Sequence, residues 1–161
     1  WIEDAVNARM IAREKGAVLI VNDRVDIAMA IDADGVHLGQ TDIPAEAARR
    51  LLGRKKIIGI STHTIEQVRD AILQPVDYIA FGPIFATTTK SDPDAVTGIE
   101  CLSEVRAIVG ELPLVAIGGI DHSNARSVID AGADSVAVIS CLLHHRHSIA
   151  DSSRELMRSI A

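Results

Sequence analysis

The chain has 161 residues, of which 48% are hydrophobic and only 2% aromatic, and its formal net charge is −6. The acidic balance disfavours nucleic-acid binding, because recognition of a phosphate backbone needs clustered lysine and arginine. No apolar run approaches the roughly 18 residues of a membrane-spanning helix, so none is predicted. Cys101 and Cys141 lack metal-ligand spacing and fit reduced thiols, so we expect a cytoplasmic protein. A core of Ile, Val, Leu and Ala suits a parallel sheet buried by helices.

Short β-branched runs alternate with helical patterns along the whole chain. The first helix is predicted over about 2–15, before the first strand. Asp42 and Pro44 predict the start of a later helix, with Asp42 or Ile43 near its N-cap and Pro44 in its first turn. Thr64 and Gln67 have the spacing of a capping box. Strands are predicted at 18–21, 35–38, 57–60, 78–81, 114–117 and 135–139.

This rhythm of about twenty residues per unit predicts repeated βα units. Such units fit either a doubly wound sheet or a (β/α)₈ barrel. Near-uniform spacing and polar residues after almost every strand favour the TIM barrel, whose strand ends converge on one mouth. We therefore expect a single α/β domain over 1–161 that contains about six of the eight βα units, with the first two strands upstream of residue 1.

The segment after the fourth predicted strand suits a phosphorylated ligand. Three consecutive threonines, Thr87, Thr88 and Thr89, can donate hydrogen bonds to phosphate oxygens. The next residue, Lys90, adds a compact positive charge. Taken singly, Lys90 also fits a surface lysine.

Two carboxylates, Asp23 and Asp42, follow the first two predicted strands. Mg²⁺ is usually held by one or two carboxylates together with substrate phosphate oxygens, so this pair predicts a magnesium site. Taken alone, Asn22–Asp23 fits a helix cap as well as a ligand, and Asp42 fits a cap better than a ligand. The remaining candidate residues at strand ends are Asn22, Ser61, Gly119, Ile139 and Ser140.

Six separated motifs resemble the thiamine-phosphate synthase family of (β/α)₈ barrels, in the order expected for that family. They run almost from end to end of the chain, which makes the resemblance specific. The motifs are 19–26, 35–42, 59–63, 77–90, 116–120 and 131–134.

The resemblance implies a transferase that joins 4-amino-2-methyl-5-pyrimidinylmethyl diphosphate to a thiazole phosphate, giving thiamine phosphate and pyrophosphate. It implies Mg²⁺ as the cofactor, bound by Asp23 and Asp42, and it is compatible with a homo-oligomer. Lys90 and Ser61 would be catalytic. The implied contacts are Asn22, Ser61 and Lys90 with the pyrimidine diphosphate, Thr87, Thr88 and Thr89 with the thiazole phosphate, and Gly119, Ile139 and Ser140 with its phosphate group.

Two other functions are compatible with this resemblance. One is a thiazole tautomerase-like paralogue that works without Mg²⁺, for which His63 would be the residue of interest. The other is a catalytically silent ligand-binding paralogue. The family also carries a Gln/Arg/Lys motif on its second strand, which should precede Trp1, so we expect an upstream segment.

Overall fold

Parallel strands follow one another in space in the same order as in the sequence. The computed structural model describes residues 2–87, 89, 94–143 and 148–161. Within these residues six strands form one sheet in the order β1-β2-β3-β4-β5-β6, and every neighbouring pair is parallel. The strands are β1 (Ile20–Asn22), β2 (Gly35–Leu38), β3 (Ile57–Thr62), β4 (Tyr78–Phe81), β5 (Leu114–Ile117) and β6 (Ser135–Ala137).

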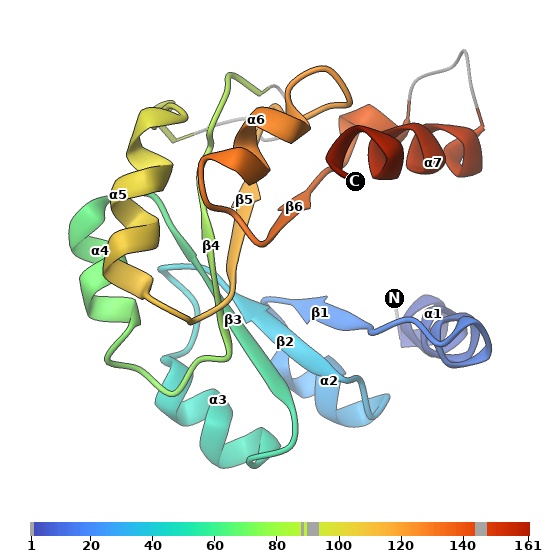
Figure 1. The fold of residues 1–161 in the computed structure, drawn as a ribbon. Helices are drawn as coiled ribbons and strands as arrows, with labels where there is room; N and C mark the ends of the chain where they lie inside the picture. The colour runs from blue at the N-terminus through green and yellow to red at the C-terminus, as the bar shows by residue number, and fades with distance from the viewer. Residues whose placement is uncertain (1, 88, 90–93, 144–147) are drawn as a thin grey trace.

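Helices α2 to α6 wrap around the outside of this curved sheet, while α1 and α7 lie beyond its two edge strands (Figure 1). No helix in the described part of the chain is long and apolar enough to cross a membrane. The helices are α1 (Ile2–Lys15), α2 (Val25–Ala30), α3 (Ala45–Leu52), α4 (Ile65–Ala71), α5 (Glu100–Val109), α6 (Ala125–Asp130), the short 3₁₀ helix η1 (Ser140–Leu142) and α7 (Ile149–Ile160).

The predicted bounds are confirmed for α1, β2, β4 and β5 and are wrong for three strands. Asn22 and Ser61 lie inside β1 and β3 rather than after them. The reason is that both still pair in the ladder, Asn22 with His37 and Ser61 with Ala80. At the other edge, β6 ends at Ala137, where its partner β5 also ends.

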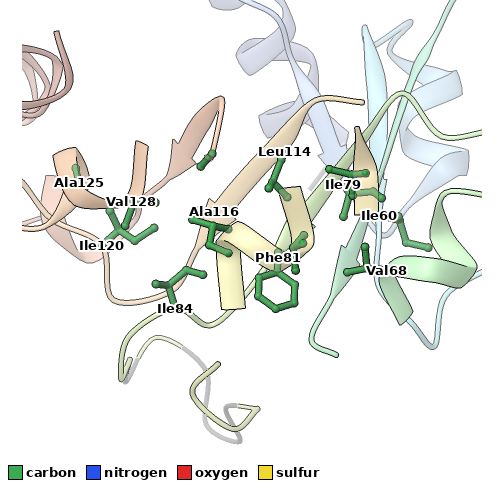
Figure 2. Close-up of a cluster of buried hydrophobic side chains, with 14 of the residues drawn as sticks. Ile60, Val68, Ile79, Phe81, Ile84, Leu114, Ala116, Ile120, Ala125 and Val128 are labelled. Carbon is green, nitrogen blue, oxygen red and sulfur yellow. The ribbon is translucent and has the colours of Figure 1, made fainter. Parts of the chain in front are cut away.

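Alternate residues of each strand point outward into the layer of helices. Figure 2 shows Ile60, Ile79 and Phe81 of the central strands near Val68 of α4, while Val128 of α6 lies beside Ile120 at the other end of the same cluster. A second cluster packs β1–β3 against α2 and α3. The opposite side chains of the strands therefore point to the inner face, which is the face that carries the polar candidates.

A recurring clamp joins the amino-terminal ends of the strands in pairs. Asp34, immediately before β2, accepts a hydrogen bond from the Leu19 N–H at 2.8 Å and returns one from its own N–H to the Leu19 carbonyl at 3.0 Å. Arg9 of α1 lies 2.5 Å from the same carboxylate oxygen. The bond from the Leu19 amide is the main cause that lowers the pKa of Asp34, followed by the bond from Arg9.

The same clamp appears twice more, with similar geometry. Asp77 exchanges two hydrogen bonds with the backbone of Ile58, and the Arg49 guanidinium of α3 lies 2.6 Å from its carboxylate. Asp134 exchanges two hydrogen bonds with the backbone of Leu114, and the Arg106 guanidinium of α5 lies 2.8 Å from its carboxylate. Each clamp thus ties one helix and two consecutive strands together, at the end of the sheet where stability rather than chemistry is expected to reside.

Asp134→Ala should lower the free energy of unfolding by about 1–3 kcal/mol, because it leaves the amide of fully buried Leu114 without its carboxylate partner. Urea titration followed by circular dichroism would measure the loss. Asp130→Ala is the matched control, since it removes the exposed Arg126–Asp130 pair within one helix and should cost about 0.5 kcal/mol or less. Equal losses from the two variants would contradict a special role for the clamp.

Candidate functional site

A pocket opens where β3, β4, β5 and β6 end. Its cavity is ≈130 Å³, and the segments that follow these four strands form its wall. Carboxyl ends of parallel strands are the positions at which α/β proteins of this kind bind ligands. The lining residues are Ser61, His63, Gly82, Pro83, Thr87, Thr89, Asp94, Ile117, Gly118, Gly119, Ile120, Ala137, Val138, Ile139 and Ser140.

The wall of the pocket is built from backbone that packs closely. The Ile84 N–H donates to the Ile117 carbonyl at 2.9 Å, and the Phe85 N–H donates to the Gly118 carbonyl at 3.1 Å. A Cβ on Gly118 would lie 2.5 Å from Pro83 Cβ, so only glycine allows this approach. Gly118 and Gly119 both have positive φ angles, +96° and +64°.

His63 stands at the pocket with its imidazole fixed on two sides. Its Nδ1 lies 2.6 Å from the Gly82 carbonyl oxygen, which can only accept, so Nδ1 carries a proton. Its Nε2 faces Asp94 Oδ2 at 3.5 Å. The His63 N–H donates to the Gln67 side chain at 2.6 Å, and Thr64 caps α4 by accepting from the Gln67 N–H, which confirms the predicted capping position.

Ser61 reaches the pocket from β3 and is tied to a histidine of the neighbouring strand. Its Oγ lies 2.8 Å from Nε2 of His37, and Nδ1 of His37 lies 2.8 Å from the Tyr78 hydroxyl. The two rings stack with centroids 5.5 Å apart. Burial raises the pKa of Tyr78 to about 12. His37 is thus a half-buried, hydrogen-bonded side chain, in agreement with its position inside a predicted strand.

The two candidate metal ligands follow adjacent strands at the same end of the sheet. Asp23 has a left-handed backbone conformation with φ +63°, and its N–H donates to the His37 carbonyl at 2.8 Å. Asp42 Oδ2 accepts from the Gly39 N–H at 2.6 Å, which closes the turn after β2. Asp42 is therefore not the cap of α3, because Pro44 occupies that position and the helix begins at Ala45.

The structure brings six of the predicted site residues into one pocket and leaves others beside it. Asn22, Asp23 and Asp42 do not line the pocket, although they lie at the same end of the sheet, and Asn22 borders a separate open depression between α1 and α2. Thr88 and Lys90 lie outside the described residues. The six residues in the pocket are Ser61, Thr87, Thr89, Gly119, Ile139 and Ser140.

Sequence reasoning did not predict Asp94 or the Tyr78–His37 pair as parts of the site. Asp94 has no local signal, since it lies in a long connection and meets His63 only through folding. The pair had a weak signal, because His37 and Tyr78 occupy alternate positions of predicted strands that place them on the inner face.

Comparison with known proteins adds an independent observation to this geometry. The profile of the thiamine monophosphate synthase family matches residues 1–142. The chain belongs to this family. It is 49% identical over 142 residues to the thiamine-phosphate synthase of Chloroflexus aurantiacus, and the match covers 88% of the chain and 65% of that protein. The chain thus spans about two thirds of the length of this relative.

Solved structures agree with the family in fold. Thiamine phosphate pyrophosphorylase from Pyrococcus furiosus superimposes with a TM-score of 0.88 at 36% identity, covering 99% of this chain and 75% of that one. The N-(5′-phosphoribosyl)anthranilate isomerase of the same organism reaches a TM-score of 0.71 at 13% identity, covering 99% of this chain and 80% of that one, which is a likeness of fold alone. The α/β fold with barrel-like relatives is confirmed.

Proposed function

We propose that the protein is a cytoplasmic thiamine-phosphate synthase, which condenses 4-amino-2-methyl-5-pyrimidinylmethyl diphosphate with a thiazole phosphate and releases pyrophosphate. The observation that carries the proposal is the pocket that joins Ser61, Thr87 and Thr89 with the Gly118–Gly119 turn, in a chain of this family. In the proposal, this chain holds about six of eight units of a (β/α)₈ barrel, and the first two strands are supplied by an upstream segment.

The proposed reaction needs no covalent bond between substrate and protein. When the bond to the diphosphate breaks, the carbon attached to the electron-rich aminopyrimidine remains as a stabilised cation. No protein nucleophile is therefore needed. Ser61, Asn22 and Lys90 would bind the departing diphosphate, and Lys90 would offset part of its negative charge. Held in line by the pocket, the thiazole nitrogen would attack the cationic carbon, which is a proximity effect.

The thiazole phosphate would occupy the side of the pocket formed by β5 and β6. Thr87 and Thr89 line the pocket, with Thr88 between them in sequence, and the threonine hydroxyls can donate to phosphate oxygens. Backbone amides of Gly119, Ile139 and Ser140, which also line the pocket, would bind the same group.

The donor set beside the pocket suits Mg²⁺. Asp23 and Asp42 follow adjacent parallel strands, and the described residues contain no group of three or more His, Cys, Asp or Glu side chains that could hold a metal. A pair of carboxylates fits an ion that takes its remaining ligands from water and substrate phosphates. When bound, Mg²⁺ would offset the negative charge of the diphosphate.

Asp42→Ala should lower pyrophosphate release by about 100-fold or more in the full-length protein supplied with both substrates and Mg²⁺. A coupled pyrophosphate assay measures the rate across a Mg²⁺ titration. Asp130→Ala, which changes an exposed aspartate of α6, serves as the control and should retain wild-type activity. Full activity of Asp42→Ala would show that the metal assignment is wrong.

The same assay separates the alternatives. Absence of pyrophosphate release from the full-length wild type would refute the synthase proposal. Isomerisation of a thiazole phosphate without Mg²⁺ would then favour the tautomerase-like paralogue, and substrate binding without turnover would favour the silent paralogue.

A further inference from the structure

We propose that Tyr78 and His37 are positioning residues, which orient the Ser61 hydroxyl so that it donates its proton into the pocket. The proposal rests on the proposed function for its catalytic consequence, although the orientation itself is a property of the folded chain. Ser61 borders the pocket, whereas Tyr78 and His37 do not line it and act only through Ser61.

The three side chains form a chain of hydrogen bonds across three strands. Tyr78 of β4 contacts Nδ1 of His37 at 2.8 Å, and Nε2 of His37 in β2 contacts Ser61 Oγ of β3 at 2.8 Å. A neutral imidazole has one donor nitrogen and one acceptor nitrogen, so the two bonds must run in the same direction. Either Tyr78 donates and Ser61 accepts, or Ser61 donates and Tyr78 accepts.

Tyr78 decides the direction. Its phenol keeps its proton, since burial raises its pKa to about 12, so the hydroxyl has a proton to donate. Within the described residues, Nδ1 of His37 is the hydrogen-bond partner found for this hydroxyl. Tyr78 therefore donates to Nδ1, which leaves the proton of His37 on Nε2, where it is donated to Ser61.

The arrangement depends on a glycine between the two rings. Gly59 of β3 pairs with His37 on one side and with Tyr78 on the other. A Cβ on Gly59 would lie 2.0 Å from Cζ of Tyr78, so the phenol ring occupies the space that any larger residue would fill. The absence of a side chain here allows Tyr78 to reach across β3 to His37.

The direction of the hydrogen bonds from Tyr78 through His37 to Ser61 decides whether Ser61 can bind an anionic ligand. Because Ser61 accepts from His37, its own proton is left to point toward the pocket. Oxygens of a diphosphate accept hydrogen bonds and do not donate them, so a Ser61 that donates binds them. With the opposite direction Ser61 would present lone pairs to the same oxygens and repel them.

Nitrogen-15 NMR of histidine-labelled protein at pH 8 tests the direction without any assay of activity. The chain has six histidines, and loss of one signal in His37→Gln assigns the resonance. We expect His37 to carry its proton on Nε2 with Nδ1 bare. A protonated Nδ1 overturns the proposal.

Calorimetric titration with Mg²⁺ and inorganic pyrophosphate tests the consequence. Tyr78→Phe keeps the ring against Gly59 and should weaken the affinity about fivefold, the value of one hydrogen bond. In a Ser61→Ala background the same change should have no further effect, because there is then no Ser61 hydroxyl for Tyr78 and His37 to orient. An equal loss in both backgrounds, or none in either, overturns the proposal.

Thr62→Val is the matched control for the loss of one buried hydrogen bond. Thr62 donates to the Ala80 carbonyl at 2.9 Å from the other face of β3, so its variant should lower stability and leave pyrophosphate affinity unchanged. Failure of the wild type to bind pyrophosphate would count against the proposed function, while the NMR result would still decide the orientation of Ser61.

Discussion

Gly118→Ala should lower the free energy of unfolding by about 3 kcal/mol, because it combines an unfavourable backbone conformation with a collision. Its φ angle is +96°, and an added Cβ would lie 2.6 Å from Pro83 Cα as well as close to Pro83 Cβ. Backbone atoms cannot turn aside as a flexible side chain can, so the wall of the pocket must shift. Urea unfolding measures the loss, and affinity for the thiazole phosphate should fall with it.

Gly16→Ala separates the two causes. Gly16, which follows α1, has a positive φ of +65°, but an added Cβ would meet no atom within 4 Å. This variant should lose only about 1 kcal/mol, the cost of the backbone conformation. Equal losses in both variants would show that the contact with Pro83 contributes nothing.

Gly59→Ala is the second change with a large expected effect. The added methyl group would overlap the Tyr78 ring, with distances of 2.0 and 2.3 Å to Cζ and Cε1. We expect a loss of about 2 kcal/mol, since the ring must leave its place and its bond to His37. Urea unfolding of the single variant measures this loss.

A double variant provides the control for Gly59→Ala. In a Tyr78→Ala background the ring is absent, and alanine in a strand is favoured over glycine by about 0.5–1 kcal/mol. Gly59→Ala should therefore be neutral or stabilising there. A loss as large as in the wild-type background would contradict the assigned collision.

The sequence allowed the strand order and much of the site to be predicted because both follow from local patterns. β-Branched runs of four residues are read directly from the chain, and the residues after them must converge if the strands are parallel. Ser61 was placed at the correct end of the sheet although it lies within β3, because one more ladder pair does not move it away from the pocket.

Contacts between distant segments could not be predicted in the same way. The His63–Asp94 contact joins residues that are 31 positions apart, and no motif relates them. The clamps did leave a signal, since an aspartate stands directly before β2, β4 and β6 but not before β3 or β5. The role of these aspartates becomes clear only in the structure, where each one bonds to the backbone at the start of the preceding strand.

The clamps also imply which parts of the chain can vary without loss of this frame. Each one encloses a helix and two strands, α1-β1-β2, α3-β3-β4 and α5-β5-β6, and no clamp crosses from one trio to the next. The long connection between Phe81 and Glu100 lies at such a border, so it can change in length or sequence without disturbing a clamp. The clamps thus reinforce alternate pairs of strands, while the ladder between β2 and β3 and the Ile57 N–H, which donates to the Asp34 carbonyl at 2.9 Å, join these pairs into one sheet.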